Sequence, residues 1–230
     1  MKRFIILITN LLLLSILIYC GYNVYIKVKD YKQADTTYEK VRKLKKEDLS
    51  NINPDFRFWL TVENTNIDYP VLQGADNNFY LNEDIYKNKL GSGSIFMDYR
   101  NTSENDENTI IYGHNMKNKT MFSQLEDFKD ESFFNKNNKI RIITNDKEYV
   151  YEVFSAYYVD PSYNYIIPKF NNDDEYEKYL NEITNKSINK SNVNVSKKDK
   201  IITLSTCSYE TNNTRTVVHG KLIDVINLNN

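Results

Sequence analysis

The chain has 230 residues, 40% of them hydrophobic and 13% aromatic, which is enough to bury a substantial core. Its 30 basic and 31 acidic side chains give a net charge of −1, so there is no electrostatic basis for nucleic-acid binding. With only six glycines and four prolines, the chain is neither collagen-like nor of low complexity.

The N-terminus carries a long apolar segment at residues 4–26, preceded by Lys2 and Arg3. About 20 apolar residues in a helix span a bilayer, so this segment is long enough to cross one. The two leading cations favour a cytoplasmic N-terminus, although Lys27 and Lys29 follow the segment closely. We therefore expect residues 1–26 to form a single-pass signal anchor at the cell membrane, with the rest of the chain extracellular.

Two other readings of this segment fit less well. A cleaved signal peptide has a shorter apolar region followed by a small-x-small site, and no Ala-x-Ala pattern follows this one. A lipid anchor on Cys20 would need a small residue before the cysteine, where this chain has the bulky Tyr19. Cys20 is then most simply a small apolar residue of the span.

Residues 27–50 are polar and rich in Lys and Glu, with no Pro or Gly. Apolar residues recur there at spacings of three and four, which predicts an amphipathic helix. The stripe consists of Tyr31, Ala34, Tyr38, Val41 and Leu44. We expect a helical stalk that packs this face onto the following domain.

From residue 51 to 230 the pattern changes to short runs rich in Ile, Val, Tyr, Phe and Thr, which favour strands. The runs are FRFWLTV, IDYPVLQG, GSIFMDYR, NTIIYGHN, KIRIIT, EYVYEVFSAYYV, KIITLSTC and TVVHGKLIDVI. About eight strands at this spacing fit one closed or nearly closed barrel. The sequence therefore predicts a mainly β domain over residues 51–230.

Two segments between these runs have helical periodicity. Residues 120–134 space Met121, Phe122, Leu125 and Phe128 on one face. Residues 171–187 begin with acidic side chains, which suit a helix N-terminus, and carry a second apolar stripe. The glycine-containing stretch 91–94 is interpreted as a hairpin turn rather than as a phosphate-binding loop.

Cys207 is the only cysteine outside the apolar N-terminal segment, so it has no partner for an intramolecular disulfide in an exported domain. Such a lone thiol is inert, intermolecular or catalytic. It lies where the apolar run KIITLS gives way to a polar loop, and a strand end is a rigid support for a nucleophile.

Arg215 opens the next apolar run, so strand pairing through the intervening loop would put a cation beside the sulfur. A solvated arginine in an exposed loop is the alternative. Of the two histidines, His114 ends a strand-like run, whereas His219 lies midway along one and is expected to be partly exposed. His114 is therefore the candidate acid–base partner. A zinc site is a weaker alternative, because the paired ligand spacing is missing.

Together these motifs resemble the class B sortases of Gram-positive bacteria. The resemblance rests on TLSTC at residues 203–207, Arg215 after a short loop, VVHGKL at 217–222, YGHN at 112–115 and the N-terminal anchor. Residues 68–82 and 93–101 also look like that class, so the similarity extends from about residue 56 to the C-terminus.

This resemblance implies an eight-stranded sortase β-barrel that works without a metal or other cofactor. It implies a membrane-anchored cysteine transpeptidase that cuts a C-terminal sorting signal of secreted proteins, of the NPxTx type, after Thr. Cys207 would be the nucleophile, His114 the general acid and then base, and Arg215 the donor to the oxyanion or substrate carbonyl. The thioester would be resolved by an amine of peptidoglycan or of its lipid-linked precursor.

The same resemblance gives candidate contacts for the sorting signal, for which ordinary packing is the alternative. They are Asn77, Leu81, Tyr165, Ile166 and Ser205. It also implies that the start of the helix at 171–187 lines the substrate groove, and that Ser208 stands where some relatives have an acidic residue. Two other functions stay open: a thiol peptidase that only hydrolyses the signal, and a non-catalytic surface β-domain.

Overall fold

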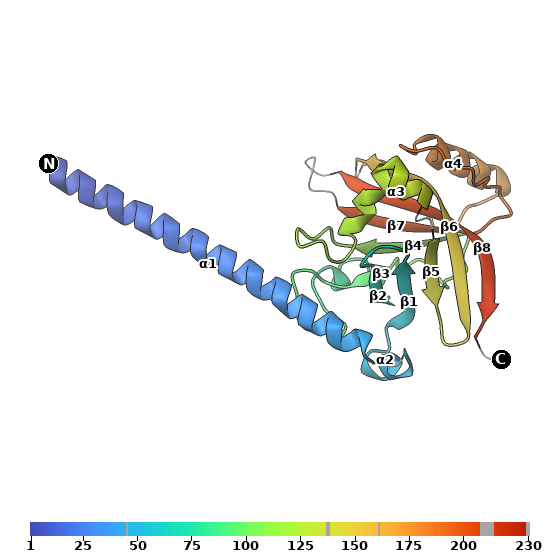
Figure 1. The fold of residues 1–230 in the computed structure, drawn as a ribbon, viewed down its shortest axis with the longest axis horizontal. Coiled ribbons are helices and arrows are strands. Elements are labelled where there is room, and N and C mark those ends of the chain that lie inside the picture. The colour runs from blue at the N-terminus through green and yellow to red at the C-terminus, as the bar shows by residue number, and fades with distance from the viewer. Residues whose placement is uncertain (45, 137–138, 161, 208–213, 229–230) are drawn as a thin grey trace.

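The computed structural model describes residues 1–230 except 45, 137–138, 161, 208–213 and 229–230, and of residues 46, 47 and 207 it describes only the backbone. It begins with the helices α1 (Lys2–Arg42) and α2 (Lys46–Ile52). In Figure 1, α1 projects as a long rod from a compact body. Its apolar part has a mean hydropathy of 2.4 and no buried residue, so by length and composition it can cross a membrane.

The C-terminal part of α1 packs on the body through the stripe seen in the sequence. Ala34, Tyr38 and Val41 are buried, and Tyr38 is the polar centre of the contact. Its hydroxyl donates to the carbonyl oxygen of Gly93 at 2.7 Å. Arg42 adds a bond from Nε to the backbone oxygen of Asp68 at 3.1 Å. This end of α1 is therefore fixed to the body at two points, Gly93 and Asp68.

The eight strands of the described residues close into a barrel in the order β1-β2-β3-β4-β7-β8-β6-β5. They are β1 (Phe56–Val62), β2 (Asp68–Leu72), β3 (Ile95–Met97), β4 (Asn108–Gly113), β5 (Lys139–Ile143), β6 (Lys147–Val159), β7 (Ile201–Cys207) and β8 (Arg215–Asn227). Each of them falls on one of the eight predicted runs. The predicted fold class, a mainly β chain built on an eight-stranded barrel, is confirmed.

Two of the strand pairs are parallel, β2 with β3 and β4 with β7, whereas the other neighbours are antiparallel. The hairpin predicted at residues 91–94 is therefore wrong, because the strand after it runs in the same direction as β2. A parallel neighbour needs a long crossover connection, and residues 73–94 provide it. Gly93 has a φ of +53° there, and a Cβ on it would collide with the carbonyl oxygens of Tyr80 and Leu81.

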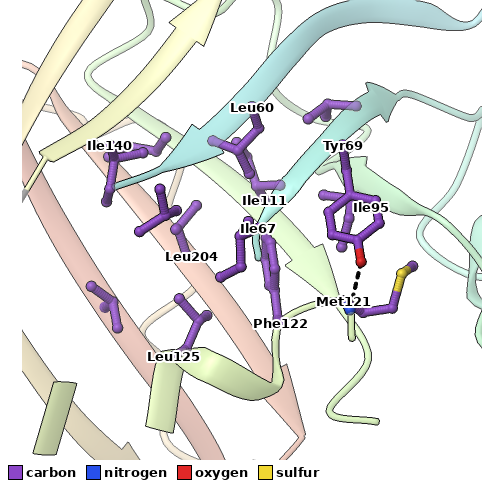
Figure 2. Close-up of a cluster of buried hydrophobic side chains, with 14 of the residues drawn as sticks. Leu60, Ile67, Tyr69, Ile95, Ile111, Met121, Phe122, Leu125, Ile140 and Leu204 are labelled. Atoms are coloured by element: carbon purple, nitrogen blue, oxygen red, sulfur yellow. Dashed lines mark hydrogen bonds between the residues drawn. The ribbon is translucent and has the colours of Figure 1, made fainter. Parts of the chain in front are cut away.

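The barrel interior holds the main hydrophobic cluster, which Figure 2 shows between β1, β2, β4 and β7. Leu60, Ile111, Ile140 and Leu204 meet there, and each is fully buried. Burying side chains of this size contributes about 1.5–3 kcal/mol each, so this cluster provides much of the barrel's stability. Phe122 enters the cluster from the segment that follows β4 and so fixes that segment to the core.

The helices lie on the outside of the barrel and in its connections. They are η1 (Phe79–Leu81), η2 (Ser123–Lys129), α3 (Glu131–Lys136) and α4 (Asp173–Asn185). The expectation of one helix over residues 120–134 is wrong, because the segment breaks at Asp130. The carboxylate of Asp130 accepts the backbone N–H of Phe133 at 2.9 Å, which caps a new helix there.

The helix expected at 171–187 is present as α4. Asn172 caps it by accepting the backbone N–H of Glu175 at 2.9 Å. The apolar stripe of α4 packs on β6, β7 and β8, and its buried members are Tyr176, Tyr179, Leu180 and Ile183. In this way α4 covers the outer face of the strands that carry the candidate site.

Candidate active site

Strand pairing brings the predicted catalytic residues to one end of the barrel. β4 and β7 run parallel with Gly113 opposite Thr206, so His114 and Cys207 are the next residues on neighbouring strands. β8 returns antiparallel with Arg215 opposite Cys207. Neighbouring strands are about 4.8 Å apart, so residues distant in the sequence become close neighbours. The side chain of Cys207 and the whole of Ser208 lie outside the described residues.

His114 is half-buried at the end of β4, and its ring is held by the backbone of η1. Nε2 lies 2.8 Å from the carbonyl oxygen of Leu81. Because a carbonyl can only accept, Nε2 carries the proton, and Nδ1 is the nitrogen left for chemistry. The backbone is fixed as well, since Phe122 donates its N–H to the His114 carbonyl at 2.9 Å.

A pocket of about 280 Å³ opens beside His114 and Arg215. Its wall combines apolar and amide side chains, as peptide-binding sites commonly do. The lining residues are Asn77, Asn78, Leu81, Phe96, Tyr112, Gly113, His114, Ile166, Ser205, Thr206 and Arg215. The pocket therefore collects residues from β3, β4, β7, β8, η1 and the connection that precedes α4.

Four of the five expected signal contacts line this pocket: Asn77, Leu81, Ile166 and Ser205. The fifth, Tyr165, is fully buried and lies behind the wall. Its hydroxyl is 2.7 Å from the Ser205 hydroxyl, so it acts on the pocket through Ser205. Among the described residues no member of α4 lines the pocket, so the expectation that the start of this helix does so is not met.

The structure adds lining residues that the sequence did not indicate. Phe96 and Tyr112 face each other across β3 and β4 with ring centroids 5.2 Å apart. The backbone oxygen of Leu81 is a further contribution, because it holds His114 while the side chain of the same residue lines the pocket. Alternation along β4 puts Tyr112 and His114 on one face, and that pattern was the available signal for Tyr112.

His219 does not belong to this site, and the expectation that it is partly exposed is wrong. It is fully buried, because α4 covers the outer face of β8 at this point. Nδ1 is 2.9 Å from the Thr203 hydroxyl and Nε2 is 2.9 Å from the Tyr157 hydroxyl. Burial lowers the pKa of His219 to about 3, so the ring is neutral.

Within the described part of the chain, no group of three or more His, Cys, Asp and Glu side chains could hold a metal ion. The acidic loop before β4 satisfies its own charge instead. Asp106 accepts from the Asn101 side chain at 2.9 Å and from the backbone N–H of Thr102 at 2.7 Å.

Comparison with known proteins agrees with this geometry. A family model described as a sortase domain matches residues 60–223. Sortase B of Staphylococcus aureus is 39% identical over 242 residues, covering 98% of this chain and 99% of that protein. The S. aureus sortase B–substrate complex superposes with a TM-score of 0.78 and 38% identity, covering 87% and 99% of the two chains.

The structure of Clostridium perfringens sortase B is also similar, with a TM-score of 0.76 and 46% identity. It matches over 78% of this chain and 100% of that one. The family model, the S. aureus relative and the two solved structures therefore agree with one another and with the barrel described above. The chain belongs to the sortase family, among the class B sortases, whose members are cysteine transpeptidases acting on surface proteins.

Proposed function

We propose that this protein is a membrane-anchored transpeptidase that cuts an NPxTx-like C-terminal sorting signal after Thr and joins the secreted protein to a peptidoglycan amine. One observation carries the proposal: His114 and Arg215 share a pocket at the strand end where β7 reaches Cys207. A thiol, an imidazole and a guanidinium are the groups that acyl transfer through a thioester requires.

In the acylation step, the one proton shared by Cys207 and His114 lies on Nδ1 of His114, and the Cys207 sulfur attacks the carbonyl carbon of the signal threonine as a thiolate. The C=O electron pair moves onto oxygen, and the Arg215 guanidinium stabilises that oxyanion with planar N–H donors. Collapse of the intermediate re-forms the carbonyl and breaks the C–N bond. His114 gives its Nδ1 proton to the leaving nitrogen, so the C-terminal fragment departs as a neutral amine and a thioester remains.

In the second step, the acceptor amine attacks the thioester carbonyl. His114, now neutral at Nδ1, takes a proton from the attacking nitrogen, and the C–S bond breaks to release the Cys207 thiolate. The products are an amide joining the surface protein to the cell wall and an enzyme in its starting protonation state. The bond from Nε2 to the Leu81 carbonyl keeps the ring in one orientation through both steps.

The pocket wall supports recognition of a short peptide. Leu81 and Ile166 offer apolar contact, while Asn77 and Ser205 offer hydrogen bonds to a peptide backbone or polar side chain. Tyr165 holds the Ser205 hydroxyl from behind and so belongs to the recognition machinery without lining the pocket.

The location follows from α1. Its apolar part suits a single crossing of the cell membrane, and Lys2 and Arg3 favour a cytoplasmic N-terminus, which leaves the barrel extracellular. There the protein would meet secreted proteins bearing the signal, and peptidoglycan or its lipid-linked precursor as the amine acceptor.

The test uses the full-length protein in detergent micelles with a quenched NPxTx-type peptide and an added amine. We expect the N-terminal peptide fragment to appear joined to the amine, in a ratio to free acid that rises with amine concentration. Release of free acid alone, unchanged by the amine, would show a thiol peptidase instead. A wild type that cleaves no peptide, and whose role in the cell is unchanged after alkylation of Cys207, would instead favour a non-catalytic surface domain.

A further inference from the structure

A buried carboxylate lies behind the pocket wall and is linked to three of its segments, two directly and one through an arginine. Asp98 directly follows β3, and its side chain is completely buried and does not line the pocket. Oδ2 accepts from the Asn77 amide at 3.0 Å and from the Tyr112 hydroxyl at 2.7 Å. Asn77 comes from the β2–β3 crossover and Tyr112 comes from β4. A single carboxylate oxygen therefore links two segments of the pocket wall.

Arg100 extends the same hydrogen-bond network to a third segment of the pocket wall, the connection between β6 and α4. Its Nε and Nη2 donate to the two Asp98 oxygens at 2.9 and 2.8 Å, a two-pronged pairing. Nη2 also donates to the backbone oxygen of Ile166 at 3.2 Å. The pocket segment between β6 and α4 is therefore connected to Asp98 through a single guanidinium.

The network fixes the orientation of the Asn77 amide. Nδ2 must face Asp98, because a carboxylate only accepts, and Oδ1 must face the backbone N–H of Tyr99, from which it accepts at 3.0 Å. An amide bonded at both ends cannot flip, and it presents one donor edge and one acceptor edge to the pocket. Asn77 is thus pre-organised for a peptide whose polar groups match that order.

The carboxylate is held in its charged form. Burial alone would raise the pKa of Asp98, but hydrogen bonds from Arg100, Tyr112 and Asn77 outweigh it and lower the pKa below its usual range. Tyr112 stays a neutral donor, because burial and the neighbouring Asp98 charge both raise its pKa. All the donors around Asp98 therefore remain correctly matched at neutral pH.

We propose that Asp98 is a positioning residue that sets the recognition wall of the pocket, holding Asn77, Tyr112 and the Ile166 segment in register with one another. This inference rests on the proposed function, since it concerns how the same pocket selects a sorting signal. Asp98 touches neither the peptide nor the reacting atoms. Its removal should therefore weaken peptide binding and selectivity while leaving the thiol and imidazole chemistry intact.

The central test is Asp98→Asn in the full-length protein, measuring KM and kcat for the signal peptide and the pH profile of Cys207 alkylation. The new amide turns an N–H toward existing donors, so we expect KM to rise about ten-fold or more, with kcat and the alkylation profile near wild type. Asp106→Asn is the matched control, a hydrogen-bonded carboxylate away from the pocket, and it should leave KM unchanged.

Arg100→Lys is a second variant, in case Asp98→Asn does not fold. It keeps a cation beside Asp98 but loses the fork that reaches both the carboxylate and Ile166, and we expect KM to rise several-fold. A wild-type KM in either folded variant would overturn the proposal, as would a fall in kcat with a shifted alkylation profile.

A double-mutant cycle with Asn77→Ala separates positioning from general weakening of the fold. If Asp98 acts through Asn77, Asp98→Asn should raise KM much less in the Asn77→Ala background than in the wild type. Equal effects in both backgrounds would contradict the proposal. A wild type that only hydrolyses the peptide would contradict the proposed transpeptidation, yet the KM ratios would still decide the role of Asp98.

Discussion

The two histidines occupy two contrasting regions of the same sheet. His219 lies in the middle of β8, where α4 covers it and where Tyr157 and Thr203 hydrogen-bond both ring nitrogens. His114 lies just beyond the end of β4, half-buried at a pocket, with one ring nitrogen held by a backbone carbonyl. The first region leaves the ring no access to substrate, and the second fixes the ring while leaving a nitrogen for proton transfer.

The difference shows how a rigid barrel supports a reactive site. In the middle of β8 both ring nitrogens of His219 are hydrogen-bonded, and burial lowers the pKa of the ring to about 3, so His219 cannot act as an acid near neutrality. A strand end fixes the backbone but leaves the side chain at a cavity, which is what a nucleophile or a general acid needs.

Substituting each histidine separately gives the largest expected difference in activity. His114→Ala should lower kcat/KM for the signal peptide by about 10³-fold, the scale of a lost general acid–base group. His219→Leu should leave kcat/KM per folded molecule within about two-fold of wild type, because His219 does not reach the pocket. Stopped assays with a fluorogenic peptide would measure both, and a similar loss in both variants would remove the distinction between the two regions.

Arg215 provides a second test of the reactive strand end. Arg215→Lys should lower kcat by about 10²-fold, because a point charge cannot replace the planar donors that stabilise the oxyanion. Single-turnover formation of the acyl-enzyme would locate the loss in the first chemical step. Near-normal turnover would contradict a role for Arg215 at the reacting carbonyl.

At the buried histidine, His219, the main effect of substitution should be a loss of folding stability. His219→Leu leaves the Tyr157 and Thr203 hydroxyls without their histidine partner, which should lower the free energy of unfolding by about 2–4 kcal/mol. Thermal and chemical unfolding of the full-length protein in micelles would measure it. His114→Ala is the control, and it should cost clearly less because His114 is only half-buried.

The smallest expected effect is a pH dependence of stability from His219. The folded ring has a pKa of about 3 and the unfolded one titrates near 6.5, so below pH 6.5 the unfolded state binds the extra proton. The contribution is complete above pH 6.5 and is lost on acidification by about 1.4 kcal/mol per pH unit. Unfolding midpoints between pH 7 and 4.5 should fall less steeply in His219→Leu than in wild type, and parallel slopes would contradict it.

Much of the fold was predictable because hydrophobic runs and turns are local properties. All eight strands and α4 lie where periodicity put them. The order of the strands was not predictable, since no local pattern indicates that β4 runs parallel to β7, the pairing that brings His114 to Cys207. The hairpin expected at residues 91–94 failed for the same reason.

The site was predictable in part. Strand-end position and the family resemblance indicated Cys207, His114 and Arg215, and the latter two line one pocket. The burial of His219 could not be predicted, because it depends on α4 covering a face of β8 that the sequence of β8 leaves unspecified. Asp98 was missed because an acidic residue after a short apolar run resembles an ordinary surface turn.

The central claim, that Cys207 carries the acyl group in a site completed by His114 and Arg215, is tested most directly by mass spectrometry of the trapped intermediate. Full-length protein mixed with a library of candidate signal peptides, without an amine, should gain the mass of the peptide fragment ending at Thr, attached to Cys207. Cys207→Ala should gain none. An adduct on another residue, or peptide cleavage that persists in Cys207→Ala, would contradict the account.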